Sequence, residues 1–220
     1  MADAFAAELV ARSREEIAAT TSENRFLDLL EAGAVPRERL AWLAGEEYRI
    51  IGSDRRSFSL LAARYPELPA GGLFLALAQG EGEALALLLD FAAALGISEK
   101  DLSAYEPKPL AQAYPAYLAQ RAIFGTASEV ALAMLANLEE WGAYCARTAE
   151  ALRSRYGLDE EAVGFFRFFA EPPPGFAEQA TEVVASGLAS GDSPEEAVRA
   201  ARMLHAYESH FWAALAEDLA

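Results

Sequence analysis

The segment SPEEAVRAARMLHAYESHFWAAL, residues 193–215, indicates how the whole chain folds. Ser193 is suited to cap the N-terminus of a helix, Pro194 to its first turn, and Glu196 completes a capping box. Apolar residues then recur at helical spacing, and we expect this helix to run to the C-terminus. The segment therefore predicts an amphipathic helix that buries one face, which is typical of an all-α protein.

The rest of the chain has the same helical character. Ala, Leu, Glu and Arg dominate, and alternating β-branched runs are nearly absent. We expect an irregularity at Gly52-Ser53-Asp54, a bend or a late helix start at Pro115, and a polar loop over residues 98–109. Glycine and proline separate further predicted helices at residues 3–20, 25–32, 36–65, 73–95, 110–124, 126–156, 159–170 and 176–189. The connections are short and no repeat or sustained heptad occurs, which predicts an all-α multi-helix bundle forming one domain over residues 1–220.

The charge balance argues against two classes of partner. The chain has 220 residues, 18 Lys and Arg against 34 Asp and Glu, and a net charge of −16. A phosphate-binding face needs clustered basic residues, so we expect no binding to nucleic acid. We also expect no membrane partner, because anionic lipid surfaces repel such a chain and the apolar stretches are interrupted by charges.

Cysteine content and the first residues bear on the cellular compartment. Cys145 is the only cysteine, which excludes an intrachain disulfide and a cysteine-based zinc site. We interpret it as a small buried residue rather than a nucleophile. Residues 1–9 lack a basic stretch followed by an apolar run, so no signal peptide is expected. The sequence predicts a cytoplasmic protein.

Two carboxylates interrupt apolar helical faces. Residues three, four and seven positions apart share one face of a helix. Glu46 points in another direction than Glu47 and is expected to be solvated. The neighbours of Glu208 on its face are Leu204, Phe211, Trp212 and Leu215, and those of Glu47 are Leu40, Leu43, Ala44, Ile50 and Ile51.

An ionised carboxylate in a protein core costs several kcal/mol unless it is paired or protonated. A chain that places Glu47 and Glu208 in this way is predicted to line a polar cavity with them. Such carboxyl groups have raised pKa values and exchange protons near neutral pH. The alternative is an internal pair of glutamate with arginine or tyrosine that only fixes packing.

Aromatic residues add to the candidate site. Tyr114 and Tyr117 place two phenols near Pro115. Asn137, Glu140, Trp141 and Tyr144 share one face of a long predicted helix, where an amide and a carboxylate beside two rings would clasp a planar heterocycle. The alternative is a set of core aromatics with a surface glutamate. The cluster at residues 165–169 is interpreted as core.

Motifs for other chemistries are missing from the sequence. There is no phosphate-binding glycine loop and no Gly-x-Ser-x-Gly elbow, so we expect no cofactor. His205 and His210 are five residues apart, about 140° around a helix, and they do not face one site. A di-iron bundle uses Glu-x-x-His pairs from two helices, which this chain lacks. No metal site is expected.

Several segments together resemble the TenA/thiaminase II family, which has a haem-oxygenase-like all-α fold. The resemblance covers nearly the whole chain, and the order and spacing of its motifs are its specific part. The segments that carry it are Asn24-Arg25-Phe26, residues 35–40, Glu46-Glu47-Tyr48, Ala78-Gln79-Gly80, Leu95-Gly96-Ile97-Ser98, Ala113-Tyr114 with Gly125, and residues 207–212.

The resemblance implies roles for individual residues. Members of that family hydrolyse an aminopyrimidine, or cleave thiamin, with a cysteine nucleophile. Glu47 falls where the family has an acidic residue that binds the pyrimidine. Tyr114 falls on a tyrosine of the pocket, and Glu208 on a glutamate of the last helix that handles protons.

Other positions depart from the family pattern. By an ungapped count, Asn137 stands at the position of the nucleophilic cysteine, and a neutral amide does not attack as a thiolate does. Ile50 stands at a usual tyrosine position, and either Phe169 or Glu171 stands at another. Glu140, one turn after Asn137, is the candidate base that activates water, and Glu139 is less well placed.

The resemblance therefore implies a divergent protein of this family that binds an aminopyrimidine or a similar planar amine. If it is an enzyme, we expect thiamin-salvage hydrolysis without a covalent thioether. The alternatives are a non-catalytic ligand-binding member of the fold and an oxidase-like branch of PqqC type. The family forms dimers or tetramers, so a homodimer or homotetramer is expected.

Overall fold

The computed structural model describes residues 2–20 and 23–219 of the chain. Within these residues the protein forms ten α-helices and no strand, which confirms the all-α prediction. In chain order the helices are α1 (Ala2–Thr20), α2 (Arg25–Glu31), α3 (Arg37–Arg64), α4 (Ala70–Ala94), α5 (Glu99–Ala104), α6 (Ala113–Phe124), α7 (Ala127–Tyr156), α8 (Gly164–Ala170), α9 (Phe176–Ala189) and α10 (Pro194–Leu215).

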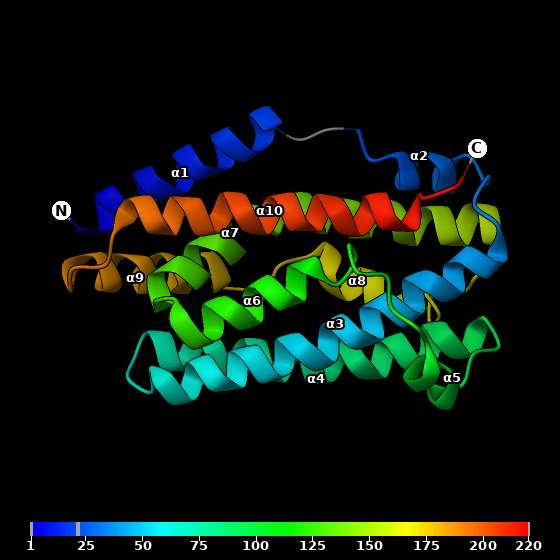
Figure 1. The fold of residues 1–220 in the computed structure, drawn as a ribbon, viewed down its shortest axis with the longest axis horizontal. Coiled ribbons are helices and arrows are strands. Elements are labelled where there is room, and N and C mark those ends of the chain that lie inside the picture. The colour runs from blue at the N-terminus through cyan, green and yellow to red at the C-terminus, as the bar shows by residue number, and fades with distance from the viewer. Residues whose placement is uncertain (1, 21–22, 220) are drawn as a thin grey trace.

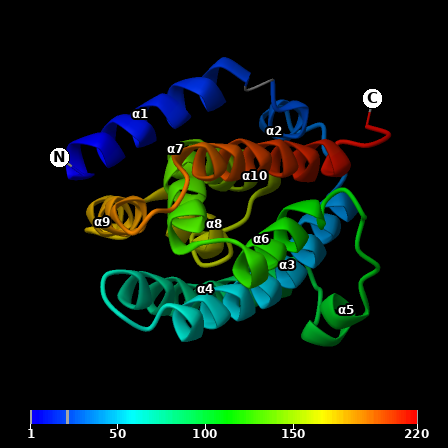
Figure 2. The same ribbon diagram turned by 60° about the vertical axis from the view of Figure 1, so that its left-hand side comes forward.

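The long helices are arranged in layers, with α10 running along the middle of the molecule (Figure 1). The α3–α4 pair packs together and forms one side, while α1 and α2 lie on the opposite side of α10. Helix α7 packs against α10, α9 and α8, and α6 bridges α3 and α10. Figure 2 shows α6 between these two helices. Helices far apart in sequence thus surround one interior.

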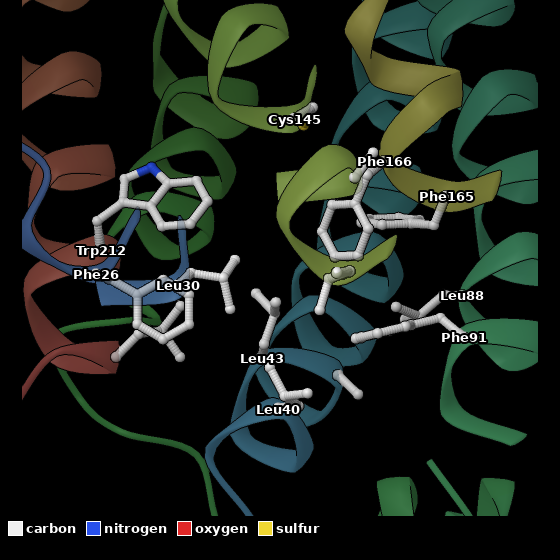
Figure 3. Close-up of a cluster of buried hydrophobic side chains, with 14 of the residues drawn as sticks. Phe26, Leu30, Leu40, Leu43, Leu88, Phe91, Cys145, Phe165, Phe166 and Trp212 are labelled. Atoms are coloured by element: carbon white, nitrogen blue, oxygen red, sulfur yellow. The ribbon is translucent and has the colours of Figure 1, made fainter. Parts of the chain in front are cut away.

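The buried apolar side chains form two clusters. The first contains Phe26, Phe91, Phe166 and Trp212, which come from α2, α4, α8 and α10 (Figure 3). The second joins residues of α1, α3, α4, α6, α7, α9 and α10. Because the two clusters are distinct, polar side chains can occupy the boundary between them.

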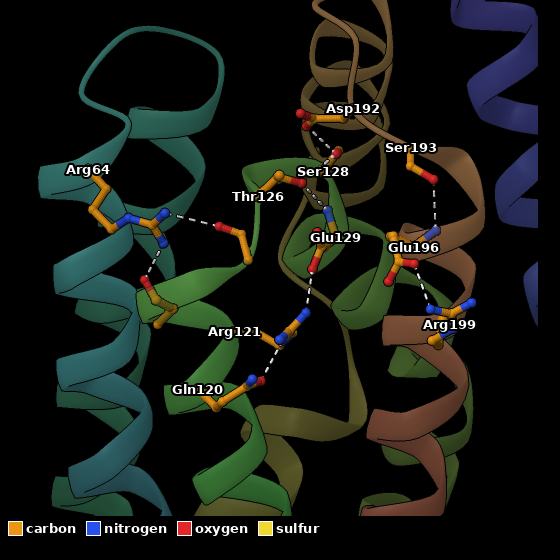
Figure 4. A network of polar contacts seen from close by, with 12 residues as sticks. Arg64, Gln120, Arg121, Thr126, Ser128, Glu129, Asp192, Ser193, Glu196 and Arg199 are labelled. Atoms are coloured by element: carbon orange, nitrogen blue, oxygen red, sulfur yellow. Dashed lines mark hydrogen bonds and ion pairs between the residues drawn. The ribbon is translucent and has the colours of Figure 1, made fainter.

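Capping residues fix the N-termini of α7 and α10 (Figure 4). The Thr126 hydroxyl accepts from the backbone N–H of Glu129, and the Ser193 hydroxyl accepts from that of Glu196. Arg121 on α6 forms an ion pair with Glu129 at 2.9 Å, which ties α6 to the first turn of α7. The predicted starts of both helices are confirmed.

Two local predictions were wrong. Helix α3 continues without interruption through Gly52-Ser53-Asp54, because Ile51, Asp54 and Phe58 are buried along one face of this helix. Residues 98–109 are not a simple loop, since they contain α5. Ser98 and Asp101 form a capping box at its start, which stabilises a helix of this short length.

Three helix boundaries differ from the predictions or refine them. Helix α6 starts late, with Pro115 in its first turn, as one of the two alternatives stated. The segment predicted as helix at 159–170 is helical only in α8, because the Asp159 carboxylate accepts from the Ala162 N–H and holds a turn. Helix α10 ends at Leu215, and Ala220 lies outside the described residues.

One helix among the described residues, α4, is long and apolar enough to cross a membrane by length and composition. In the folded chain α4 packs along α3, and it carries Glu81, Glu83 and Asp90.

Candidate functional site

A cavity of about 710 Å³ lies where the two apolar clusters meet. Helices α3, α4, α7, α8 and α10 form most of its walls, and the starts of α6 and α9 and residues 171–174 complete them. Its volume is typical of a site for a small molecule. Most of the lining is apolar or aromatic and includes Ile50, Ile51, Leu77, Met134, Leu204, Phe211, Trp141, Phe168 and Phe169.

Four buried or half-buried carboxyl groups line this cavity, and the exposed Glu83 and Glu171 stand at its wall as well. Glu47 and Asp54 come from α3, Glu81 from α4 and Glu208 from α10. Glu47 and Asp54 are seven residues apart, which places them on one face of α3, and each is only 2% exposed. Glu81 and Glu208 are half-buried, and Glu208 also lines a second cavity. Glu47 and Glu208, which the sequence analysis expects around one cavity, both line this one.

Burial shifts the two carboxyl groups of α3 towards their neutral forms. Desolvation, together with the neighbouring Asp54 and Glu46 carboxylates, raises the pKa of Glu47 to about 8. Desolvation raises the pKa of Asp54 to about 7, although the Tyr114 hydroxyl, which donates to Asp54 Oδ2 at 2.8 Å, acts in the opposite direction. Both groups therefore hold or release a proton near neutral pH.

The two remaining carboxyl groups are shifted in the same direction. Desolvation and then the charges of Asp54 and Glu47 hold the pKa of Glu81 well above its ordinary value. Desolvation, then Glu140, Asp54 and Glu47 do the same for Glu208. The described part of the chain provides no arginine or lysine ion pair to any of the four groups. Arg167 is on the cavity wall too, but its guanidinium pairs with Glu150 and Glu160, so the four carboxyl groups form a proton-binding cluster without a paired basic group among the described residues.

Three buried side-chain oxygens on the cavity wall have no hydrogen-bond partner among the described residues. They are Glu47 Oε1, Asp54 Oδ1 and Asn137 Oδ1. The Asn137 amide nitrogen is engaged, because it donates to the carbonyls of Ala133 at 2.8 Å and Ala201 at 3.3 Å. The free oxygen of Asn137 is consequently held in place by the two bonds of its nitrogen.

The structure places several other predicted residues on the same wall. Ile50 and Tyr114 line the cavity, and so do both alternatives for the aligned tyrosine position, Phe169 and Glu171. Trp141 lines it as well. The cavity therefore brings together side chains from the middle of α3, the start of α6, the middle of α7 and the end of α8.

Two predicted residues lie elsewhere. Tyr117 is not on the cavity wall, and it packs against Tyr207 with ring centroids 5.2 Å apart. Glu140 lines the second cavity, where it accepts from the Tyr144 hydroxyl at 3.0 Å and lies 3.0 Å from His205 Nδ1. Asn137 and Glu140, which were expected in one site, line different cavities, since Asn137 lines the central cavity.

The expectation that Glu46 is solvated was wrong. Glu46 is 0% exposed, and three donors hold its carboxylate: the Tyr105 hydroxyl at 2.8 Å, the Lys108 backbone N–H at 2.7 Å and the Gln112 side chain. The chain between α5 and α6 covers this face of α3. The spacing of apolar residues within α3 does not reveal that another segment packs over Glu46.

Sequence reasoning missed Asp54 and Glu81. The signal was present in both cases, because each acid interrupts an apolar face just as Glu47 does. Asp54 has Ile50, Ile51, Phe58 and Leu61 at helical spacing, and Glu81 has Phe74, Leu77, Ala84, Leu85 and Leu88. The expected irregularity around Gly52 concealed the first of these patterns.

The single cysteine lies away from both cavities. Cys145 is fully buried and lines neither cavity, and burial holds the pKa of its thiol well above the ordinary value. Its interpretation as a buried small residue is confirmed. Among the residues that the structure describes, no group of three or more His, Cys, Asp and Glu side chains is arranged to hold a metal ion.

Comparisons with known proteins agree with this architecture. A TenA homologue protein from P. horikoshii OT3 is 17% identical, with a TM-score of 0.73 over 96% of this chain and 97% of that chain. A TenA homologue from Pyrococcus furiosus is 18% identical, with a TM-score of 0.67 over 96% and 99%. A domain of unknown function with a heme oxygenase-like fold from Shewanella denitrificans OS217 is 17% identical, with a TM-score of 0.70 over 94% and 88%. At these identities the likeness shows the fold, which is haem-oxygenase-like as expected.

A search of curated protein sequences finds no match to this chain. The model of the TENA/THI-4/PQQC family, in contrast, matches residues 14–218, which is nearly the whole chain. This chain therefore belongs to the TENA/THI-4/PQQC family.

Proposed function

We propose that the central cavity binds a small planar amine, such as an aminopyrimidine, and that the protein hydrolyses a carbon–nitrogen bond of this ligand. The observation that carries the proposal is the set of three unpartnered oxygens: Glu47 Oε1, Asp54 Oδ1 and Asn137 Oδ1. A buried oxygen without a partner is costly, and carboxylate and amide oxygens accept hydrogen bonds. The cavity therefore favours a ligand that is rich in N–H groups.

The charge and shape of the cavity support the same class of ligand. Carboxyl groups that share a site of low dielectric repel one another when ionised, and a cationic or protonated amine relieves this repulsion. The rings of Trp141, Phe168 and Phe169 on the wall offer faces for a planar heterocycle. Ile50, at a usual tyrosine position of the family, and Phe169, which with Glu171 is one of two alternatives for another, give the wall apolar surface.

We assign Glu208 the role of general acid and base. Burial and the neighbouring carboxylates raise the pKa of Glu208, which favours its protonated form, and in this scheme that form donates its proton to the leaving nitrogen. A water molecule adds its oxygen to the carbon that the nitrogen leaves and gives its proton to the Glu208 carboxylate. The products are an alcohol and a free amine, and the carboxyl group is regenerated.

No covalent intermediate belongs to this scheme. Asn137 stands at the usual position of the nucleophilic cysteine, and an amide is not a nucleophile for this step. Cys145 lines neither cavity. Asn137 acts instead by accepting a hydrogen bond from the ligand through its free oxygen.

Tyr114 and Glu140 are positioning residues in this proposal. The Tyr114 hydroxyl donates to Asp54 and so fixes one of the four carboxyl groups. Glu140 is engaged by Tyr144 and His205 on the far side of Glu208, where its charge contributes to the raised pKa of Glu208. We therefore place the catalytic proton on Glu208 rather than on Glu140.

The substitution Glu208→Gln tests the catalytic assignment. Because glutamine cannot exchange a proton, we expect turnover of 4-amino-5-aminomethyl-2-methylpyrimidine to fall by about 100-fold or more. Binding of this compound should weaken by less than about tenfold, because Glu47, Asp54 and Asn137 remain. Product formation by mass spectrometry and affinity by calorimetry are the two measurements.

Glu182→Gln, an exposed substitution on α9, is the matched control and should leave both values unchanged. Near-normal turnover in Glu208→Gln contradicts the role of Glu208. Saturable binding by the unsubstituted protein without any product contradicts hydrolysis and supports a ligand-binding member of the family instead.

A further inference from the structure

A second cavity, of about 520 Å³, lies beside the central one. Its walls come from the start of α2, residues 108–110, the middle of α7 and the C-terminal part of α10 with the residues that follow. It shares two wall residues, Trp141 and Glu208, with the central cavity. The proposed function makes no use of this space.

Both basic groups on the described wall of the second cavity, and two of its acidic groups, are already engaged with other groups of the protein. Lys108 forms an ion pair with Glu217 at 2.9 Å, and the Arg25 guanidinium donates to the Leu219 carbonyl. Glu140 has Tyr144 and His205 as partners. An anionic ligand would have to break the contacts of Arg25 or Lys108, so the cavity does not favour an anion.

Two neutral hydrogen-bond donors on this wall have no partner among the described residues. They are the Asn24 side-chain Nδ2 and the Trp212 indole Nε1, and their residues are 8% and 4% exposed. The Asn24 Oδ1 is engaged, because it accepts from the Leu27 N–H and caps α2. Buried donors without a partner are costly, which makes these two N–H groups a place for a ligand's acceptor atoms.

The wall around these donors is aromatic. The Tyr144 and Trp212 rings have centroids 5.6 Å apart, and those of Trp141 and Trp212 are 5.9 Å apart. Aromatic side chains with one polar atom suit a planar ring that carries an acceptor. The polarity is the reverse of the central cavity, where the unpartnered atoms are acceptors.

We infer that the second cavity is a separate binding site for an uncharged planar molecule with hydrogen-bond acceptors, held by Asn24 Nδ2 and Trp212 Nε1. Its occupant meets Glu208 and Trp141 from the side opposite the amine site. The site does not depend on hydrolysis or on the identity of the amine.

The test uses N,N-dimethylbenzamide, which has a planar ring and a strong acceptor but no donor. Asn24→Asp keeps the acceptor that caps α2 and replaces the donor with a carboxylate, so we expect affinity for the probe to fall at least fivefold. Trp212→Phe removes the second donor, with the same expectation. Titrations followed by ligand-observed NMR give the dissociation constants, and circular dichroism checks the fold of each variant.

Two matched controls separate the site from general effects. Gln120→Glu adds the same negative charge at an exposed position of α6, and Trp42→Phe removes an indole that lines neither cavity. Both should bind the probe as the unsubstituted protein does. If Trp212→Phe fails to fold, Asn24→Asp decides the test, because its cap is retained.

Failure of the unsubstituted protein to bind the probe saturably overturns the inference, as does unchanged affinity in Asn24→Asp. Aminopyrimidine binding is titrated on the same samples. Its loss with retained probe binding counts against the proposed function and leaves the second site standing.

Discussion

Glu46 and Glu47 are neighbours in the chain, yet the protein solves the problem of burying each of them differently. Three donors from the 105–112 segment hold Glu46. Glu47 keeps one oxygen unpartnered and instead has its pKa raised to about 8 by burial and by nearby carboxylates. A satisfied buried carboxylate supports structure, whereas an unsatisfied one on a cavity wall is available to a ligand.

Glu47 should make the stability of the protein depend on pH. The folded protein keeps a proton on Glu47 up to about pH 8, while the unfolded chain loses it near the ordinary pKa of 4.5. The free energy of unfolding therefore falls as the pH rises from 4.5 through 8, since the unfolded state then binds fewer protons. Glu47→Gln should reduce this fall by on the order of 2 to 4 kcal/mol, as measured by urea denaturation across this range.

The Glu47→Gln variant keeps three other carboxyl groups with raised pKa values, those of Asp54, Glu81 and Glu208. Its free energy of unfolding should therefore still fall with rising pH, but less steeply than that of the unsubstituted protein. Glu182→Gln serves as the control and should keep the full slope. An identical pH dependence in Glu47→Gln and the unsubstituted protein would mean that Glu47 is ionised in the fold.

Helix α3 is the element that organises the site. It presents Glu47, Ile50 and Asp54 to the cavity along one face, and it binds the 105–112 segment with another through Glu46. The Tyr105 ring lies so close to α3 that a Cβ atom at Gly45 would come within 2.4 Å of its Cγ atom. A glycine is therefore needed at this point of the helix.

Substitutions at two glycines of α3 should have opposite effects. Gly45→Ala forces the Tyr105 ring away from α3 and should lower the free energy of unfolding by about 1 to 3 kcal/mol. Gly52→Ala meets no atom within 4 Å, and it should raise the free energy of unfolding by about 0.5 to 1 kcal/mol, because alanine favours the helix. Urea denaturation at pH 7 measures both, and a stabilising Gly45→Ala would refute this account of the contact.

Elements and site residues were predictable to different degrees for a physical reason. Signals inside one helix, such as the cap at Ser193 and the apolar neighbours of Glu208, are local and were sufficient. The burial of Glu46 and the packing of Tyr117 against Tyr207, away from the central cavity, depend on which other segment packs there. Such contacts join residues 59 positions apart or more, and periodicity carries no record of them.

At the scale of the whole molecule, the site exists because two apolar clusters meet without merging. The central cavity takes wall residues from both clusters, Ile51 and Phe211 from the first and Leu73 and Leu204 from the second. The carboxyl groups come from α3, α4 and α10, so no isolated segment carries the site. The bundle as a whole sets the distances among them.

The expected homodimer or homotetramer is a prediction for the whole molecule. Three large apolar side chains are exposed near one end of α3, α4 and α6: Leu68 at 82%, Leu75 at 63% and Phe124 at 74%. Burying them against a second copy would be favourable. Light scattering after gel filtration should give two or four times the chain mass of 23.7 kDa, and Leu75→Lys should lower it. A mass of one chain at all concentrations would contradict the prediction.

In the proposed function, an amine and protons compete for the buried carboxyl groups of the central cavity. Calorimetric titration of 4-amino-5-aminomethyl-2-methylpyrimidine at pH 7.5, in phosphate and again in Tris, tests this most directly, because the difference in heat counts the protons released. We expect saturable binding with proton release that decreases in Glu47→Gln. Absence of binding, or equal heats in both buffers with unchanged affinity in Glu47→Gln, would contradict it.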